Sequence, residues 1–261
     1  MKKTLLAVTM AALALPVASQ AAESELSGNM SITSDYRFRG ISQSNKQPAL
    51  QGGIDYAHSS GLYIGNWNSS VSQWASNLGA GIEMDVYAGY STEVGGLGVD
   101  VGTIYYYYPN ARVSVADAKN HANTQEAYIG LSYGIVTFKT SYTLSDRYFT
   151  LGTGGDTTLQ SGATPSSKGT LYYDLSLSYE LTQGISLSAH AGSLSLKNKV
   201  GSSIKDYSVG VAYALKDWEL GLSVYSTSGL NAADKAFFTT LDGKSTKLYG
   251  SGAAVSLSRS F

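Results

Sequence analysis

The amino-acid sequence predicts an all-β protein: a transmembrane, antiparallel, up-and-down β-barrel of about twelve strands. Three observations predict this fold. Apolar and polar residues alternate with a period of two along most of the chain, and helical spacing is not sustained anywhere after residue 22. Short turns and long polar loops alternate between these segments, which would collect the long loops at one end. Aromatic residues on the apolar faces lie near the strand ends, as in the interface bands of membrane barrels.

The first 21 residues have the layout of a secretory signal. Lys2 and Lys3 form a basic start, an apolar run extends from Leu5 to Val17, and small residues precede the end of the segment at Ala21. The run is shorter than the roughly 20 apolar residues that a membrane-spanning helix needs. We therefore expect a signal peptide at 1–21 and a barrel domain at 22–261.

The composition argues against several classes of protein. Charged residues make up 14% of the chain, against roughly 25% in ordinary soluble domains, while Gly (29) and Tyr (20) are abundant. Without the signal, 18 − 2 = 16 basic residues face 19 acidic ones, which gives no basic surplus for nucleic acid. The chain has no Cys, so it has no disulfide, thiolate metal site or Cys nucleophile.

The strands are predicted from the alternation itself. In the best example, 171–181, Leu and Tyr occupy one face while Asp, Ser and Glu occupy most of the other. Twelve such segments are expected at 26–38, 48–58, 61–68, 79–91, 97–108, 124–133, 135–146, 170–181, 185–195, 204–214, 217–226 and 249–261. The long loops between them are expected at 39–47, 69–78, 109–123, 147–169, 196–203 and 227–248, and two of these, 147–169 and 227–248, are long enough to fold inward.

Aromatic side chains on the apolar faces are expected to lie at the two membrane interfaces, because amphipathic rings prefer the level of the lipid headgroups. A soluble β-sandwich would also alternate, but it would not separate its aromatics by strand end. The residues assigned to these bands include Tyr36, Phe38, Tyr105, Tyr107 and Tyr173 toward the long loops, and Trp218 and Phe261 toward the short turns.

The polar faces would then enclose the interior, which determines its charge. The interior acids are expected to be Asp35, Asp55, Glu83, Asp85, Asp100, Glu126, Asp174, Glu180, Asp206 and Glu219, and the interior bases Arg37 and Lys139. The formal charge of the interior would be 2 − 10 = −8, and acidic rings favour cations in a pore. The residues expected to line a pore are Asp35, Arg37, Glu83, Asp85, Lys139, Asp174 and His190.

Two runs near the start carry a family resemblance. SGNMSITSDYRFRGISQS (27–44) and PALQGGIDYAHSSGLYIGNW (48–67) resemble the N-terminal signature of the TorF family of porins, which are exported proteobacterial proteins of similar length. The resemblance extends to the terminal VSLSRSF and implies an outer-membrane barrel for small solutes, without implying a particular substrate. Arg259 departs from the alternation of the final strand, and its long side chain is expected to snorkel to water.

From these observations we expect a bacterial outer-membrane porin that passes small solutes by diffusion, leans toward cations and needs no cofactor. Its expected partners are outer-membrane lipid, lipopolysaccharide and the barrel assembly machinery, which would bind through Phe261.

Two alternatives stay open. Opposed interior charges could brace a non-conducting structural or adhesive barrel. Less plausibly, His190 beside Ser188 could serve a lipid hydrolase, although the sequence shows no compact set of nucleophile, base and acid, and no His pair has zinc spacing.

Overall fold

The fold is a closed barrel of twelve antiparallel strands, as the sequence predicts. The computed structural model describes residues 24–72, 80–109, 111, 122–149, 166–199, 203–240 and 246–261. The expected signal peptide at 1–21 lies outside the described residues. No helix in the described part of the chain is long and apolar enough to span a membrane.

Each barrel strand pairs with its neighbours in the chain, and the first pairs with the last. The strands are β1 (Glu25–Thr33), β4 (Ala49–Ala57), β5 (Leu62–Ser70), β6 (Ile82–Val94), β7 (Leu97–Tyr107), β8 (Thr124–Tyr133), β9 (Val136–Thr143), β10 (Leu171–Thr182), β11 (Ile185–Ser195), β12 (Ile204–Leu215), β13 (Trp218–Ser228) and β14 (Gly252–Ser260). Where β1 meets the end of β14, the Phe261 amide donates to the Gly28 carbonyl at 2.9 Å, and the Gly28 amide donates to the Phe261 carbonyl at 2.7 Å. The terminal Phe261 therefore helps to close the cylinder.

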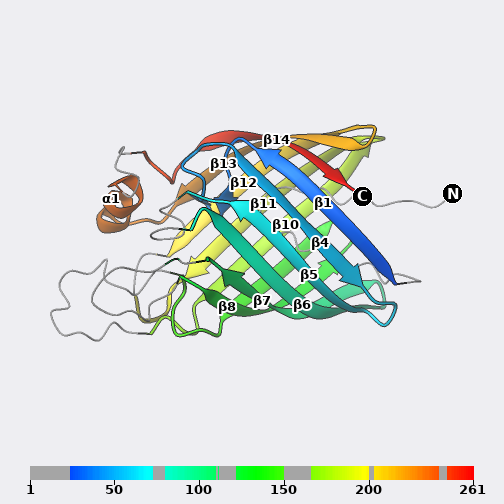
Figure 1. Ribbon diagram of the computed structural model, residues 1–261, viewed down its shortest axis with the longest axis horizontal. Coiled ribbons are helices and arrows are strands. Elements are labelled where there is room, and N and C mark those ends of the chain that lie inside the picture. Colours follow the sequence, from blue (N-terminus) through cyan, green and yellow to red (C-terminus); the bar gives the residue numbers. More distant parts are fainter. Residues whose placement is uncertain are drawn as a thin grey trace.

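Short and long connections lie at opposite ends of the barrel. Figure 1 shows helix α1 (Ala232–Thr240) beyond one end and the C-terminus at the other. The long connections, which include the 3₁₀ turn η1 (Lys197–Lys199), belong to the end with α1. The short turns at the other end contain glycines with positive φ, such as Gly134 at 58° and Gly184 at 81°, where a side chain would be strained.

The outer wall of the barrel is apolar. Large aliphatic and aromatic side chains on every strand point away from the interior and are about 40–70% exposed; examples are Leu26, Ile54, Val86, Leu175, Val209, Leu222 and Val255. A water-soluble protein rarely exposes so continuous an apolar surface. An apolar outer band and a polar interior are the pattern of a barrel surrounded by lipid.

The segment that follows β1 departs from the prediction. The first strand ends at Thr33 rather than at residue 38, and residues 34–48, which we call the inward segment, fold into the barrel. They contain the small hairpin β2 (Arg37–Phe38) and β3 (Ile41–Ser42). The alternation continued past Thr33 because β2 is also extended, and a period of two reports the backbone conformation, not the sheet to which a strand belongs.

The assignment of Tyr36 and Phe38 to the membrane interface was therefore wrong. Tyr36 is 1% exposed, and its phenol donates to Glu83 Oε1 at 3.0 Å inside the barrel. Phe38 packs edge-on against Tyr106 and Phe149, with ring centroids 5.6 and 5.3 Å apart. The barrel interior, and not lipid, surrounds both rings: Tyr36 is buried and Phe38 is partly buried.

The abundant Gly and Tyr have a shared structural use. Five tyrosines point inward and lie across an inward-facing glycine of a neighbouring strand, where an added Cβ would overlap the phenol. The pairs are Tyr63 with Gly89, Tyr87 with Gly65, Tyr128 with Gly102, Tyr172 with Gly192, and Tyr225 with Gly252. Each glycine leaves room for a large ring, so the interior is filled without any change of strand register.

Candidate functional site

The inward segment turns back on itself through a tight hairpin. Arg39 and Gly40, the two residues between β2 and β3, have φ values of 47° and 82°. Positive φ at both central residues characterises the type I′ turn that joins two-residue hairpins. Glycine adopts this conformation freely, whereas Arg39 does so at a cost that its contacts must offset.

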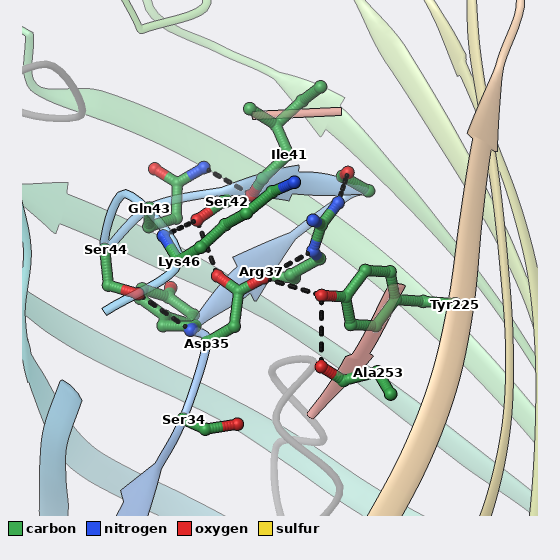
Figure 2. Close-up of polar contacts among 12 residues, drawn as sticks. Ser34, Asp35, Arg37, Ile41, Ser42, Gln43, Ser44, Lys46, Tyr225 and Ala253 are labelled. Atoms are coloured by element: carbon green, nitrogen blue, oxygen red, sulfur yellow. Dashed lines mark hydrogen bonds and ion pairs between the residues drawn. The ribbon is translucent and has the colours of Figure 1, made fainter. Parts of the chain in front are cut away.

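A buried carboxylate organises the base of this hairpin (Figure 2). Asp35 accepts hydrogen bonds from Arg37 Nε at 2.9 Å, from the Ser42 hydroxyl at 2.5 Å and from the phenol of Tyr225 on β13 at 2.8 Å. Arg37 also donates to the Gly40 carbonyl at 2.8 Å, and its guanidinium carbon lies over the Tyr225 ring, 3.8 Å from the centroid. The network fixes the hairpin and attaches it to the wall.

Further contacts attach the inward segment to other parts of the wall. Arg39 forms a two-pronged ion pair with Glu126 on β8, at 2.8 and 2.7 Å. The Thr227 hydroxyl on β13 donates to the Gly40 carbonyl at 2.6 Å. Together with the bond from Tyr36 to Glu83 on β6, these contacts reach β6 and β8 on one side of the barrel and β13 on the other. The segment therefore crosses the lumen.

The inward segment and the wall enclose a charged cavity of about 140 Å³. Its charged lining residues are Asp35, Arg37, Arg39, Lys139, Asp174, His190, Asp206 and Glu219, accompanied by the phenols of Tyr106, Tyr128, Tyr172 and Tyr225. Typical ligand pockets measure roughly 300–1,000 Å³, so this cavity suits only a very small solute. Four acids face two arginines, one lysine and one histidine, so its formal charges are nearly balanced.

His190 is bound on both sides by carboxylates. Its Nδ1 lies 3.0 Å from Asp174 Oδ2, and its Nε2 lies 2.7 Å from Asp206 Oδ2. The Ser176 hydroxyl is 3.4 Å from Nδ1 but donates to Asp174 at 2.6 Å. With an acceptor at each ring nitrogen, the imidazole is held as a double donor and has no free lone pair to act as a base.

Lys139 contributes a cation of another kind. Its ammonium lies over the ring of Tyr128, 3.9 Å from the centroid, and no ion pair within 4.0 Å is formed with any described residue. Stacking on an aromatic face stabilises the charge without neutralising it. Among the basic residues of the cavity, Lys139 is therefore the one best placed to interact with a charged solute.

Glu83 and Asp85 form a second charged centre, on β6. They are 1% and 0% exposed and are not among the residues that line the cavity. Burial, together with the nearby carboxylates of Glu83 and Asp85, raises the pKa of Tyr36 in the inward segment and of Tyr108 just beyond β7. Two phenols thus face two carboxylates in the water-poor space beneath the inward segment.

An apolar cluster covers part of the interior at the long-loop end. Ile41 of the inward segment packs with wall residues and with Phe238 of α1, and the cluster also includes Tyr148, Tyr172, Leu194, Ile204, Leu230 and Leu248. This places part of the predicted long loop 227–248 over the mouth of the barrel. Residues 150–165, within the other predicted long loop, lie outside the described residues.

The structure places all seven residues expected to line a pore inside the barrel. Asp35, Arg37, Lys139, Asp174 and His190 share the cavity, whereas Glu83 and Asp85 form the separate centre. The remaining residues expected at the interfaces point outward: Tyr105, Tyr107 and Tyr173 are each about 40% exposed, Phe261 is 70% exposed, and Trp218 lies on the outer face of β13.

Sequence reasoning missed Arg39, which it left in a loop. The adjoining glycine in FRGI was the available signal, because Arg-Gly flanked by apolar residues suits a two-residue hairpin. Arg259 behaves as expected: its guanidinium lies over Trp218, 5.7 Å from the ring centroid, and reaches Asp217 at 3.9 Å at the short-turn end.

Residues 17–261 match the model of a family described as bacterial proteins of unknown function (Gcw_chp). This chain belongs to the Gcw_chp family. No curated protein matches it.

Solved structures show which fold the Gcw_chp chain shares. The KdgM porin matches with 9% identity and a TM-score of 0.50, over 91% of this chain and 99% of that one. The KdgM porin in complex with disordered oligogalacturonate gives a TM-score of 0.51 with the same identity and coverage. The NanC porin gives 11% identity and a TM-score of 0.53, over 90% and 99% of the two chains. At these identities the likeness shows the fold alone.

Proposed function

We propose that this protein is a passive channel for small hydrophilic solutes in the bacterial outer membrane. The observation that supports it best is the combination of an apolar outer wall with a charged cavity inside one closed twelve-stranded cylinder. The likeness of the fold to the KdgM and NanC porins supports the proposal. The cofactor-free diffusion of solutes requires nothing more than such a lumen.

The inward segment would set the size limit of the channel. Barrels of about eight strands are filled by side chains, whereas those of 16–18 strands leave a wide aqueous channel, so twelve strands lie between these cases. Here the inward segment crosses the lumen and leaves a cavity of about 140 Å³. We expect solutes of a few heavy atoms to pass this constriction and larger ones to be excluded.

A modest preference for cations is part of the proposal. Asp35, Asp174 and Asp206 are paired with Arg37 or His190, so they contribute little net field to the cavity. The surplus of acid lies at Glu83 and Asp85, which have no basic partner among the described residues. Both carboxylates are buried outside the cavity lining, so they would favour cations only through their electric field, where they are ionised.

The location and partners follow from the same proposal. The signal expected at 1–21 and the resemblance to the TorF family both support export to the outer membrane. Lipid and lipopolysaccharide would contact the apolar wall, with Tyr105, Tyr107, Tyr173, Trp218 and Phe261 near the headgroups. The exposed ring of Phe261 at the end of β14 would be available to the barrel assembly machinery.

Recording from the purified protein in planar lipid bilayers tests the channel. We expect discrete conductance steps with a reversal potential that favours cations. Arg39→Gln, which releases the inward segment from Glu126, should enlarge the steps. Lys46→Gln removes one positive charge from an exposed position of the same segment and should leave the steps unchanged. Folded protein that never conducts would overturn the proposal.

A non-conducting structural barrel is the second candidate, favoured by the small cavity and the many contacts of the inward segment. Under this alternative, neither the native protein nor Arg39→Gln conducts. A hydrolase gains no support from the geometry, because carboxylates occupy both sides of His190.

A further inference from the structure

The outward faces of the twelve barrel strands carry only two charged side chains, and both are basic. Every other outward position of the described strands holds an uncharged residue; the exceptions are Lys205 on β12 and Arg259 on β14. Arg259 lies at the short-turn end, where it contacts Asp217 and Trp218. Lys205 lies at the long-loop end and shares its face with Tyr207. A charge on the lipid side of a barrel is tolerated near an interface, where the side chain can reach polar headgroups.

Two further exposed lysines lie on the rim next to Lys205. Lys197 follows the end of β11, and β11 pairs with β12 through Ser193 and Lys205. Lys168 precedes β10, in a segment attached to that of Lys197, because the Lys197 amide donates to Thr170 Oγ1 at 3.1 Å. The three lysines therefore come from the adjacent ends of β10, β11 and β12. None of them forms an ion pair within 4.0 Å with any described residue.

The surroundings of Lys205 suit an anion at the edge of a membrane. Ser193 on β11 and Ser228 on β13 are the register partners of Lys205 and face outward beside it. Tyr173 and Tyr207 lie farther from the rim on the same outer wall, 41% and 45% exposed, and aliphatic side chains follow them along the strands. Ammonium and hydroxyl groups, then aromatic rings, then an aliphatic wall match the order of groups in a phosphorylated lipid, from phosphate to acyl chain.

The nearby acids do not neutralise these lysines. Asp206 follows Lys205 in β12 but points inward, where it is bound to His190 at 2.7 Å. Asp146 is exposed close to the same rim, where its carbonyl accepts the Ser166 hydroxyl at 2.9 Å, yet its carboxylate forms no ion pair with a described residue. Three lysines against one acid leave a local excess of positive charge on this part of the rim.

We propose that Lys168, Lys197 and Lys205 bind a phosphate group of lipopolysaccharide, the phosphorylated glycolipid of the outer leaflet. Clusters of basic residues beside a membrane recognise anionic lipid headgroups, and the acyl chains would lie along the apolar wall of β10, β11 and β12. The inference rests on the outer-membrane location proposed above and adds a specific lipid site to it. It also orients the barrel, because the long-loop end would face the outside of the cell.

Native mass spectrometry of the folded full chain in detergent tests the site, with bisphosphorylated lipid A as the probe. One lipid A should bind per barrel in the presence of EDTA, which removes divalent cations that would otherwise bridge phosphates to acids. Lipid A without its phosphates should bind more weakly. Lys197→Gln and Lys205→Gln should each weaken binding of the bisphosphorylated form about fivefold. Both side chains are exposed, so the variants should fold, and thermal unfolding checks that they do.

The matched control is Lys216→Gln, which removes a 90% exposed lysine at the short-turn end and should bind lipid A as the native protein does. Equal affinity for lipid A with and without phosphates, or equal losses in Lys216→Gln and Lys205→Gln, would overturn the site. Displacement of lipid A by millimolar inorganic phosphate would overturn the lipid as its ligand. Bilayer recordings separate the two proposals: a conducting barrel that ignores the phosphates refutes the lipid site alone, and a silent barrel that binds lipid A refutes the channel alone.

Discussion

Arg39 and Glu126, 87 residues apart in the chain, form a two-pronged ion pair in the barrel interior, with both partners less than 10% exposed. The guanidinium also lies over the rings of Tyr172 and Phe38, 4.3 and 4.7 Å from their centroids. A turn residue with positive φ is thus held by charge and by aromatic stacking at once. This contact connects the inward segment to β8, which lies five strands from β1 one way round the barrel and seven strands the other way.

Breaking this pair should destabilise the fold and loosen the segment. Arg39→Gln leaves the Glu126 carboxylate buried without its partner, which typically costs about 3–5 kcal/mol. The double variant Arg39→Gln with Glu126→Gln should recover part of this loss, because two amides can bond to each other. Urea unfolding in detergent micelles measures the free energies, with Lys46→Gln as the exposed control. Equal losses in the single and double variants would contradict this account.

The tip of the hairpin should not tolerate a side chain. A Cβ at Gly40 would lie 2.7 Å from Asp206 Cβ and 2.8 Å from Thr227 Oγ1. Gly40→Ala should therefore destabilise the barrel by about 1–3 kcal/mol from overpacking, beyond the strain of its positive φ. Gly250→Ala is the matched control, since Gly250 has a φ of 86° and nothing within 4 Å of the added atom. If both variants melt at the same temperature, the tip does not touch the wall as described.

The tyrosine and glycine pairs should also be sensitive to a single methyl group. An added Cβ at Gly65 would overlap the Tyr87 ring and the Asp55 carboxylate. We expect Gly65→Ala to cost about 1–3 kcal/mol and to slow folding into lipid vesicles. Gly130→Ala places the same methyl on another inward glycine whose nearest neighbour would be an ordinary 3.7 Å away. Thermal unfolding should separate the two, and comparable losses would show that the phenol does not need the space.

Lipid should contact the outer face only. In variants that retain a single tryptophan, Trp218 fluorescence should be quenched by nitroxide-labelled lipid, and most strongly when the label is near the headgroup. Trp67, which faces the interior and packs against Tyr36 with ring centroids 5.5 Å apart, should be quenched much less. Quenching of Trp67 as strong as that of Trp218 would show that the two faces have been assigned the wrong way round.

Much of the fold could be predicted because a barrel strand repeats one simple constraint. Along 171–181, every second residue faces outward, so the pattern by itself fixes which side chains are apolar and where the strand runs. The predicted and observed strands at 124–133 and 185–195 agree to the residue. The even strand number and the segregation of long connections followed from the same repetition.

The site was predicted only in part. Alternation correctly placed Asp174 and His190 on the inner face, because both lie on barrel strands. It failed at Tyr36 and Phe38, since an extended residue in an inward hairpin produces the same period as one in the wall. No local pattern could reveal that Arg39 meets Glu126, because their contact depends on how a flexible connection crosses the lumen.

The sequence alone therefore determined the cylinder. The period of two shows which face of each strand is apolar, and this pattern can be read without knowing which residues meet in space. Only the tertiary structure decided what fills the cylinder. Which carboxylates are paired, which are left unpaired at Glu83 and Asp85, and how little space remains depend on where residues 34–48 fold. The physical reason is that ion pairs and hydrogen bonds form between side chains that are close in space. The number of residues between two strands in the chain does not predict how close their side chains lie in the barrel.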